Sequence, residues 1–111
     1  MIIHKDSDKI TLYEFKKWLG QNSDLVVGRT LLSCCCPYAN FLKHVLDISV
    51  VNVCADFFEI DGVRYKTPKG IDLFIKLLDQ PPQLFRDPII GARCLDLIEQ
   101  NTVKFTVMRI D

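Results

Sequence analysis

The chain has 111 residues, and its 14 basic and 14 acidic side chains leave no formal net charge at pH 7. Hydrophobic residues make up 49% of the sequence and charged residues 25%, which is the balance of a folded domain. Because there is no basic excess, we expect no binding to nucleic acid. No segment approaches the roughly 20 apolar residues of a membrane span, so we expect no membrane partner. We expect one domain over residues 1–111 that needs no cofactor.

The N-terminus and the cysteines indicate the compartment. Residues 1–6 lack the basic region and apolar core of a secretory signal. The chain has five cysteines, and an odd number without a signal argues against a framework of disulfides. We therefore expect reduced cysteines and a cytoplasmic location.

The first predicted helix spans residues 11–20. Thr11 and Glu14 have the spacing of a capping box. In this motif the Thr11 side chain accepts from a backbone N–H early in the helix, and the Glu14 side chain accepts from the Thr11 N–H. Gly20 is predicted as the C-terminal cap. Trp18 lies on the apolar stripe of this helix and is predicted as a core anchor.

Residues 25–27 are predicted to be extended, with Gly28 forming a turn of positive φ. A second helix is predicted to begin at Cys36-Pro37, because proline at the first helical position loses no hydrogen bond. Asp47 is predicted to end this helix.

The middle of the chain predicts strands. Residues 48–55 are rich in β-branched residues on both faces, which predicts a strand covered on both sides. Asp61-Gly62 between two apolar runs predicts a hairpin with a type I′ turn over residues 57–66. In that register Glu59 faces Arg64 and Phe58 faces Tyr65, which are favourable cross-strand pairs.

Two helices and a strand are predicted for the last third of the chain. Thr67-Pro68 and Asp87-Pro88 each have the form of a cap followed by proline, and each predicts the start of a helix. Gln80-Pro81-Pro82 ends the first of these helices, and the following Leu84 and Phe85 are expected to pack on the core. Residues 103–107 alternate in hydropathy, which predicts a half-buried strand. The whole pattern predicts a single small α+β domain whose mainly antiparallel sheet contains a central hairpin plus the C-terminal strand, with about four helices.

Cys36 is the cysteine with a physical reason to be reactive, because a helix N-terminus favours the thiolate. Cys36-Pro37-Tyr38-Ala39 resembles the Cys-Pro-Tyr active-site tetrad of glutaredoxins, with alanine in place of the second cysteine as in one-thiol variants. The resemblance implies redox activity at Cys36. The chain departs from the family where the strand runs directly into the hairpin, without the further helix and the Thr-Val-Pro turn of that fold.

Two other site types use the same cysteine. A metal site would use Cys34 and Cys36, with Cys54 and His44 as conceivable further ligands, although no Cys-x-x-Cys pair occurs. A Cys-His hydrolase would pair Cys36 with His4 or His44, but His44 lies about 12 Å further along the helix axis. Cys54 and Cys94 are predicted to be small buried side chains.

No catalytic constellation emerges, so the sequence favours a non-catalytic module over an enzyme. The main hypothesis is a protein-interaction or regulatory module that binds another protein or a second copy of itself. The alternative hypothesis is redox sensing or metal binding by the cluster from Cys34 to Cys36. The candidate interaction residues lie on the hairpin and on the C-terminal strand, whose edge could pair with another chain: Phe58, Arg64, Tyr65, Lys104, Thr106 and Met108.

Overall fold

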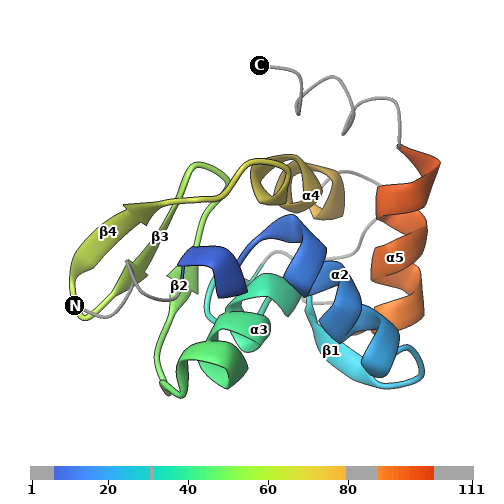
Figure 1. The fold of residues 1–111 in the computed structure, drawn as a ribbon, viewed down its shortest axis with the longest axis horizontal. Helices are drawn as coiled ribbons and strands as arrows, with labels where there is room; N and C mark the ends of the chain where they lie inside the picture. The colour runs from blue at the N-terminus through green and yellow to red at the C-terminus, as the bar shows by residue number, and fades with distance from the viewer. Residues whose placement is uncertain (1–6, 31, 80–87, 102–111) are drawn as a thin grey trace.

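The computed structural model describes residues 7–30, 32–79 and 88–101. Its helices and strands are shown in Figure 1 and have these bounds: η1 Ser7–Lys9, α2 Leu12–Gln21, β1 Val26–Arg29, α3 Pro37–Leu46, β2 Asn52–Val53, β3 Phe57–Ile60, β4 Val63–Lys66, α4 Ile71–Leu78, β5 Pro88–Ile90 and α5 Gly91–Gln100. In these described ranges four α-helices accompany small antiparallel sheets, which confirms the predicted α+β class. The predicted C-terminal strand and the loop residues Leu84 and Phe85 lie outside the described residues. Within the described ranges, no helix has the length and apolar character needed to cross a membrane.

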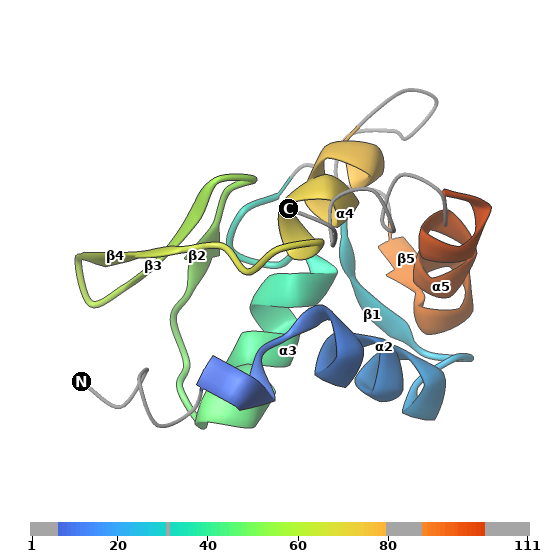
Figure 2. The same cartoon turned by 45° about the horizontal axis from the view of Figure 1, so that its top comes forward.

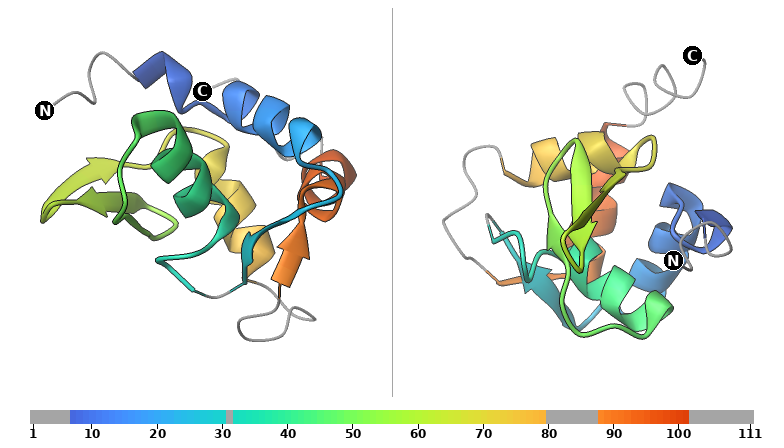
Figure 3. Two further views of the ribbon diagram at one scale, coloured as in Figure 1. Left: turned by 90° about the horizontal axis from the view of Figure 1, so that it is seen from below. Right: turned by 90° about the vertical axis from the view of Figure 1, so that its left-hand side faces the viewer.

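The strands of the described residues form two separate sheets. One has the order β2-β3-β4, and the other pairs β1 with β5. The β3–β4 hairpin lies at one end of the molecule, and β5 and α5 lie at the other (Figure 3, left). The second sheet was not predicted, because Asp87-Pro88 was interpreted as a helix start. Pro88–Ile90 instead pairs with β1 next to α5, which begins only at Gly91 (Figure 2).

The predicted hairpin is confirmed in detail. Asp61 and Gly62 have φ values of 53° and 77°, the two positive angles that a type I′ turn requires. Glu59 pairs with Arg64 and Phe58 with Tyr65, as the sequence indicated. The turn chemistry alone therefore fixes the register of β3 against β4.

The predicted strand over residues 48–55 is much shorter, since only Asn52 and Val53 form β2. Val51 and Val53 are buried, whereas Val50 is 66% exposed and Asn52 is also exposed. The prediction that both faces are covered is therefore wrong. On the outer face Val50, Asn52 and Cys54 are exposed, whereas Ile48 is partly buried against the core.

Two predicted helix ends are also corrected. Gly20 lies inside α2, and the C-terminal cap is Asn22, whose Nδ2 donates to the Trp18 carbonyl at 2.8 Å. Thr67 does not cap α4, because Gly70 at φ 91° stands between Thr67 and the helix. The buried Thr67 hydroxyl instead donates to the Cys54 carbonyl at 3.3 Å. The predicted N-terminal cap of α2 is confirmed, since the Glu14 N–H donates to the Thr11 hydroxyl at 3.3 Å.

The core is built around aromatic rings from α2, α3 and α4. Phe15 is fully buried, and its ring lies 5.1–5.4 Å, centroid to centroid, from the rings of Tyr38, Phe41 and Phe74. The Tyr38 hydroxyl donates to the Ile10 carbonyl at 2.7 Å, so this buried polar group is satisfied. Aromatic packing therefore fixes the position of α2 on α3, where the site residues below are found.

Gly28 has a different role from the predicted turn. It lies within β1, and it is not among the glycines with positive φ. A Cβ at Gly28 would lie 2.5 Å from the backbone nitrogen of Pro37 and 2.7 Å from the Cys35 carbonyl oxygen. Only glycine lets β1 approach the start of α3 so closely.

This close approach predicts the effect of adding one methyl group. We expect Gly28→Ala to lower the free energy of unfolding by about 1–3 kcal/mol, because the methyl group meets backbone that cannot rotate away. Gly20→Ala is the matched control, since nothing lies within 4 Å of a Cβ there. Because Gly20 lies on the exposed face of α2, Gly20→Ala should raise the free energy of unfolding by about 0.5–1 kcal/mol. Urea unfolding of both variants measures the difference, and equal stabilities would contradict the packing described.

Candidate functional site

The cysteines lie in a turn that precedes α3 and is held on several sides. Arg29 of β1 donates its backbone N–H to the Cys35 carbonyl at 2.9 Å, and Val53 of β2 donates to the Ser33 carbonyl at 3.0 Å. The Lys43 ammonium of α3 donates to the Cys34 carbonyl at 2.8 Å. Three consecutive carbonyls are thus bonded to three different elements, which fixes the backbone of the turn.

Cys36 forms the N-terminal cap of α3, as predicted. Its sulfur accepts from the Ala39 N–H at 3.4 Å, and Pro37 occupies the first helical turn. The side chain is only 5% exposed, and burial raises the pKa of the Cys36 thiol from 9.0 to about 12. The expectation that the pKa of Cys36 is lowered is therefore wrong. Desolvation of the charged form outweighs the hydrogen bonds that the helix N-terminus supplies.

Cys34 and Cys35 are brought together instead. Their sulfur atoms are 3.0 Å apart, and both side chains are partly exposed. The hydrogen bond with Cys34, followed by partial burial, raises the pKa of the Cys35 thiol, while the nearby charges of Lys43 and Arg29 act to lower it. The sequence offered no account of this pair, because the contact depends on the turn backbone.

The structure does not assemble the conceivable metal ligands. Among the side chains of the described ranges, no group of three or more His, Cys, Asp or Glu residues could hold a metal ion. Cys36 and Cys54 line the same hollow of about 340 Å³, together with Asp79. Cys54 is exposed, so the prediction that it is buried is wrong, whereas Cys94 is buried as predicted.

His44 belongs to a different hollow from Cys36, so the structure does not bring the Cys36–His44 hydrolase pair together. The other candidate base, His4, lies outside the described residues. No catalytic pair that the sequence suggested is thus found in the described part of the chain.

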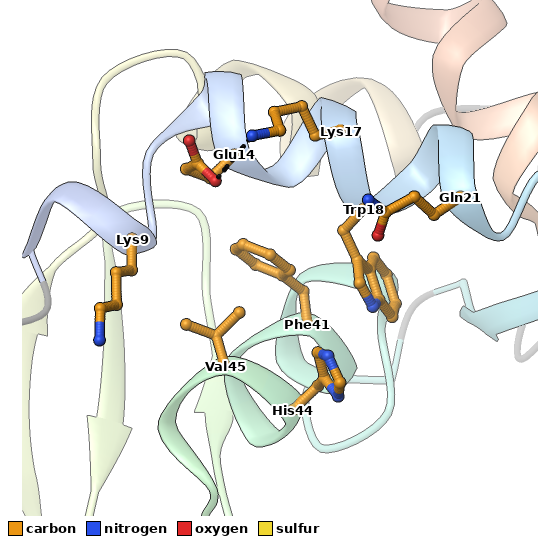
Figure 4. Close-up of a pocket in the computed structure, with 8 residues that line it drawn as sticks. All are labelled: Lys9, Glu14, Lys17, Trp18, Gln21, Phe41, His44 and Val45. Atoms are coloured by element: carbon orange, nitrogen blue, oxygen red, sulfur yellow. Dashed lines mark ion pairs between the residues drawn. The ribbon is translucent and has the colours of Figure 1, made fainter.

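The hollow beside His44 lies between α2 and α3 and has a volume of about 380 Å³ (Figure 4). Trp18 and Phe41 give it an apolar wall, and the Glu14–Lys17 ion pair at 3.7 Å lies along the α2 side. Trp18 is half-buried, so it is a core anchor with one accessible side. The sequence pattern predicted that Trp18 packs on the core, but it did not predict that one side of Trp18 is accessible.

The hairpin residues predicted for interaction divide into buried and accessible groups. Phe58 is fully buried against Tyr65, with ring centroids 5.5 Å apart, and is corrected from an interaction residue to a core residue. Arg64 is exposed and Tyr65 is half-buried. The three remaining candidates lie outside the described residues: Lys104, Thr106 and Met108.

Among the described strands β4 is the last of its sheet, and part of its backbone faces away from β3. The register and the Thr67 N–H bond to the Asp56 carbonyl make Ile60–Val63 and Phe58–Tyr65 the hydrogen-bonded pairs. The peptide groups of Arg64 and Lys66 consequently point to the outer edge. Within the described residues, no strand pairs with that edge.

Comparisons of the chain with protein-family models, curated proteins and solved structures found no match. The functional argument consequently rests on the geometry of the cysteine turn, the hollow between α2 and α3, and the edge of β4.

The buried thiols predict how stability depends on pH. Burial raises the pKa values of both Cys36 and Cys94 from 9.0 to about 12. Between these pH values the unfolded chain loses protons that the folded chain retains, so stability is full below pH 9.0 and is lost as the pH rises. We expect the free energy of unfolding to fall by up to about 1.4 kcal/mol per pH unit for each thiol.

Urea unfolding under reducing conditions across this pH range measures the slope. Cys94→Ala should remove the contribution of one buried thiol to the slope and leave that of Cys36. Identical slopes in the wild-type chain and Cys94→Ala would contradict the assignment.

Proposed function

We propose that this chain is a small non-catalytic protein-binding module that pairs an extended segment of a partner protein with the outer edge of β4. The observation that carries the proposal is the outward direction of the Arg64 and Lys66 peptide groups. Unpaired peptide groups along an exposed strand form a template for main-chain hydrogen bonds with a further strand. Val63 at the start of β4 is 50% exposed and adds apolar surface beside this template.

The charges next to the edge indicate the chemistry of the partner. Arg64 and Lys66 are two residues apart, so both side chains lie on one face of the sheet and both are exposed. Glu59 lies 3.6 Å from Arg64, and the Arg64 guanidinium lies 4.2 Å from the centre of the Phe57 ring. These contacts hold Arg64 over the sheet. A segment with acidic side chains at alternate positions complements this face.

The same charges argue against a second copy of the chain as the strand that pairs with β4. In an antiparallel pair of two β4 strands centred on Tyr65, Arg64 of one copy would lie opposite Lys66 of the other. Like charges directly opposite one another destabilise a strand pair. We therefore propose another protein, rather than a homodimer through β4, as the partner.

A displayed library of random peptides tests the proposal. We expect the wild-type chain to enrich peptides with alternating acidic residues. Arg64→Pro should weaken their binding by about tenfold or more, because proline removes an outward N–H that β3 does not use. Arg64→Ala is the matched control, since it removes the same side chain but keeps the N–H. It should lose only the electrostatic part of the affinity.

Two results would count against the proposal. One is the absence of any enriched peptide with a folded wild-type chain, and the other is equal binding by Arg64→Pro and Arg64→Ala. Circular dichroism and the melting temperature establish that both variants are folded. A dimer in light scattering that Arg64→Pro dissolves would instead show that β4 pairs with a second copy.

A further inference from the structure

We propose that Cys34 and Cys35 form a vicinal dithiol that low-molecular-weight disulfides oxidise reversibly to a disulfide between these two adjacent residues. The sulfur atoms already lie 3.0 Å apart and are partly exposed. A disulfide bond is about 2.0 Å long, so a small movement of the side chains brings the sulfurs to bonding distance. The proposal goes beyond partner binding and does not depend on the edge of β4.

The backbone of the turn holds the two thiols ready for this reaction. The Cys34 carbonyl accepts from Lys43 Nζ, and the Cys35 carbonyl accepts from the Arg29 N–H and from Asn40 Nδ2 at 3.3 Å. The Cys35 N–H donates to the Leu32 carbonyl at 3.0 Å, which closes the turn. Groups fixed in contact react with one another far faster than groups that must first meet.

The other three cysteines lack this combination of exposure and a neighbouring sulfur. Cys36 and Cys94 are buried, and their thiols have raised pKa values that disfavour the reactive thiolate. Cys54 is exposed, but among the described residues the sulfurs in contact are those of Cys34 and Cys35. The geometry thus selects one pair out of five thiols.

The reaction proceeds in two exchange steps. In the first step the Cys34 thiol gives its proton to water, and the resulting thiolate attacks one sulfur of the small disulfide. That S–S bond breaks, and the first small thiol leaves with a proton. Cys35 then loses its proton and attacks the Cys34 sulfur of the mixed disulfide, which expels the second small thiol. In total the protein gives up two electrons and two protons, and the small disulfide becomes two thiols.

The short spacing of adjacent residues makes the oxidised form easy to reduce. Consecutive Cα atoms are about 3.8 Å apart, which is shorter than the usual Cα separation across a disulfide. The ring is therefore strained, and strained exposed disulfides are the labile ones. An excess of a small thiol should reverse the reaction.

Oxidised glutathione is the probe, and mass spectrometry after an acid quench and trypsin digestion is the readout. Cleavage after Arg29 and Lys43 gives the peptide 30–43, which contains Cys34, Cys35 and Cys36. In the wild-type chain we expect this peptide to lose two hydrogens in mass without retaining glutathione, and to recover them with excess reduced glutathione. Cys54 should carry a glutathione adduct, since it has no resolving thiol.

Three variants assign the bond. Cys34→Ser and Cys35→Ser should each keep a glutathione adduct on the remaining exposed cysteine of the pair. Cys36→Ser is the matched control, because serine also caps a helix N-terminus, and it should still form the disulfide. Either of two results would overturn the proposal: a wild-type peptide 30–43 that stays reduced or retains glutathione while Cys54 reacts, or loss of the disulfide in folded Cys36→Ser.

Discussion

The close approach of β1 to the start of α3 is the contact on which the rest of the structure depends. Gly28 leaves no room for a side chain between β1 and the backbone of Cys35 to Pro37. The approach is fixed by hydrogen bonds at both neighbours: Asn40 Nδ2 donates to the Val27 carbonyl at 2.8 Å, and Arg29 donates to Cys35. One short segment thereby joins the β1–β5 sheet, the cysteine turn and α3.

Local signals in the sequence predicted the structure wherever a hydrogen bond or a dihedral angle within a few residues decides it. Thr11 and Cys36 cap helices through groups three residues away, and Asp61-Gly62 supplies the two positive φ angles of the hairpin turn. Asp47 ends α3 in the left-handed conformation, which a short polar side chain tolerates. These choices need no knowledge of the distant chain, so the hairpin and the starts of α2 and α3 could be predicted.

Features that depend on distant segments could not be predicted in the same way. From the sequence alone, Pro88–Ile90 resembles a helix start. In the structure it forms a strand instead, because β1 supplies its hydrogen-bonding partners. The alternating strand over residues 48–55 shows two candidate faces, and only the tertiary structure determines that the face with Cys54 remains exposed. Cys36 has the helix N-terminus that lowers a thiol pKa, but the side chains that bury it come from elsewhere in the chain. Burial is a sum over the whole fold, whereas capping is local.

The cysteine turn shows how one segment separates structural from chemical roles. Its carbonyls at Ser33, Cys34 and Cys35 accept hydrogen bonds from β2, α3 and β1. The backbone of the turn therefore has a structural role, because it connects these three elements. Cys36 also has a structural role, because its buried sulfur caps α3. Only the sulfurs of Cys34 and Cys35 remain without a part in the packing of the core. Since the bonds that fix the backbone also position these two residues with their sulfurs 3.0 Å apart, the rigidity of the turn is the basis of the chemistry we propose for them.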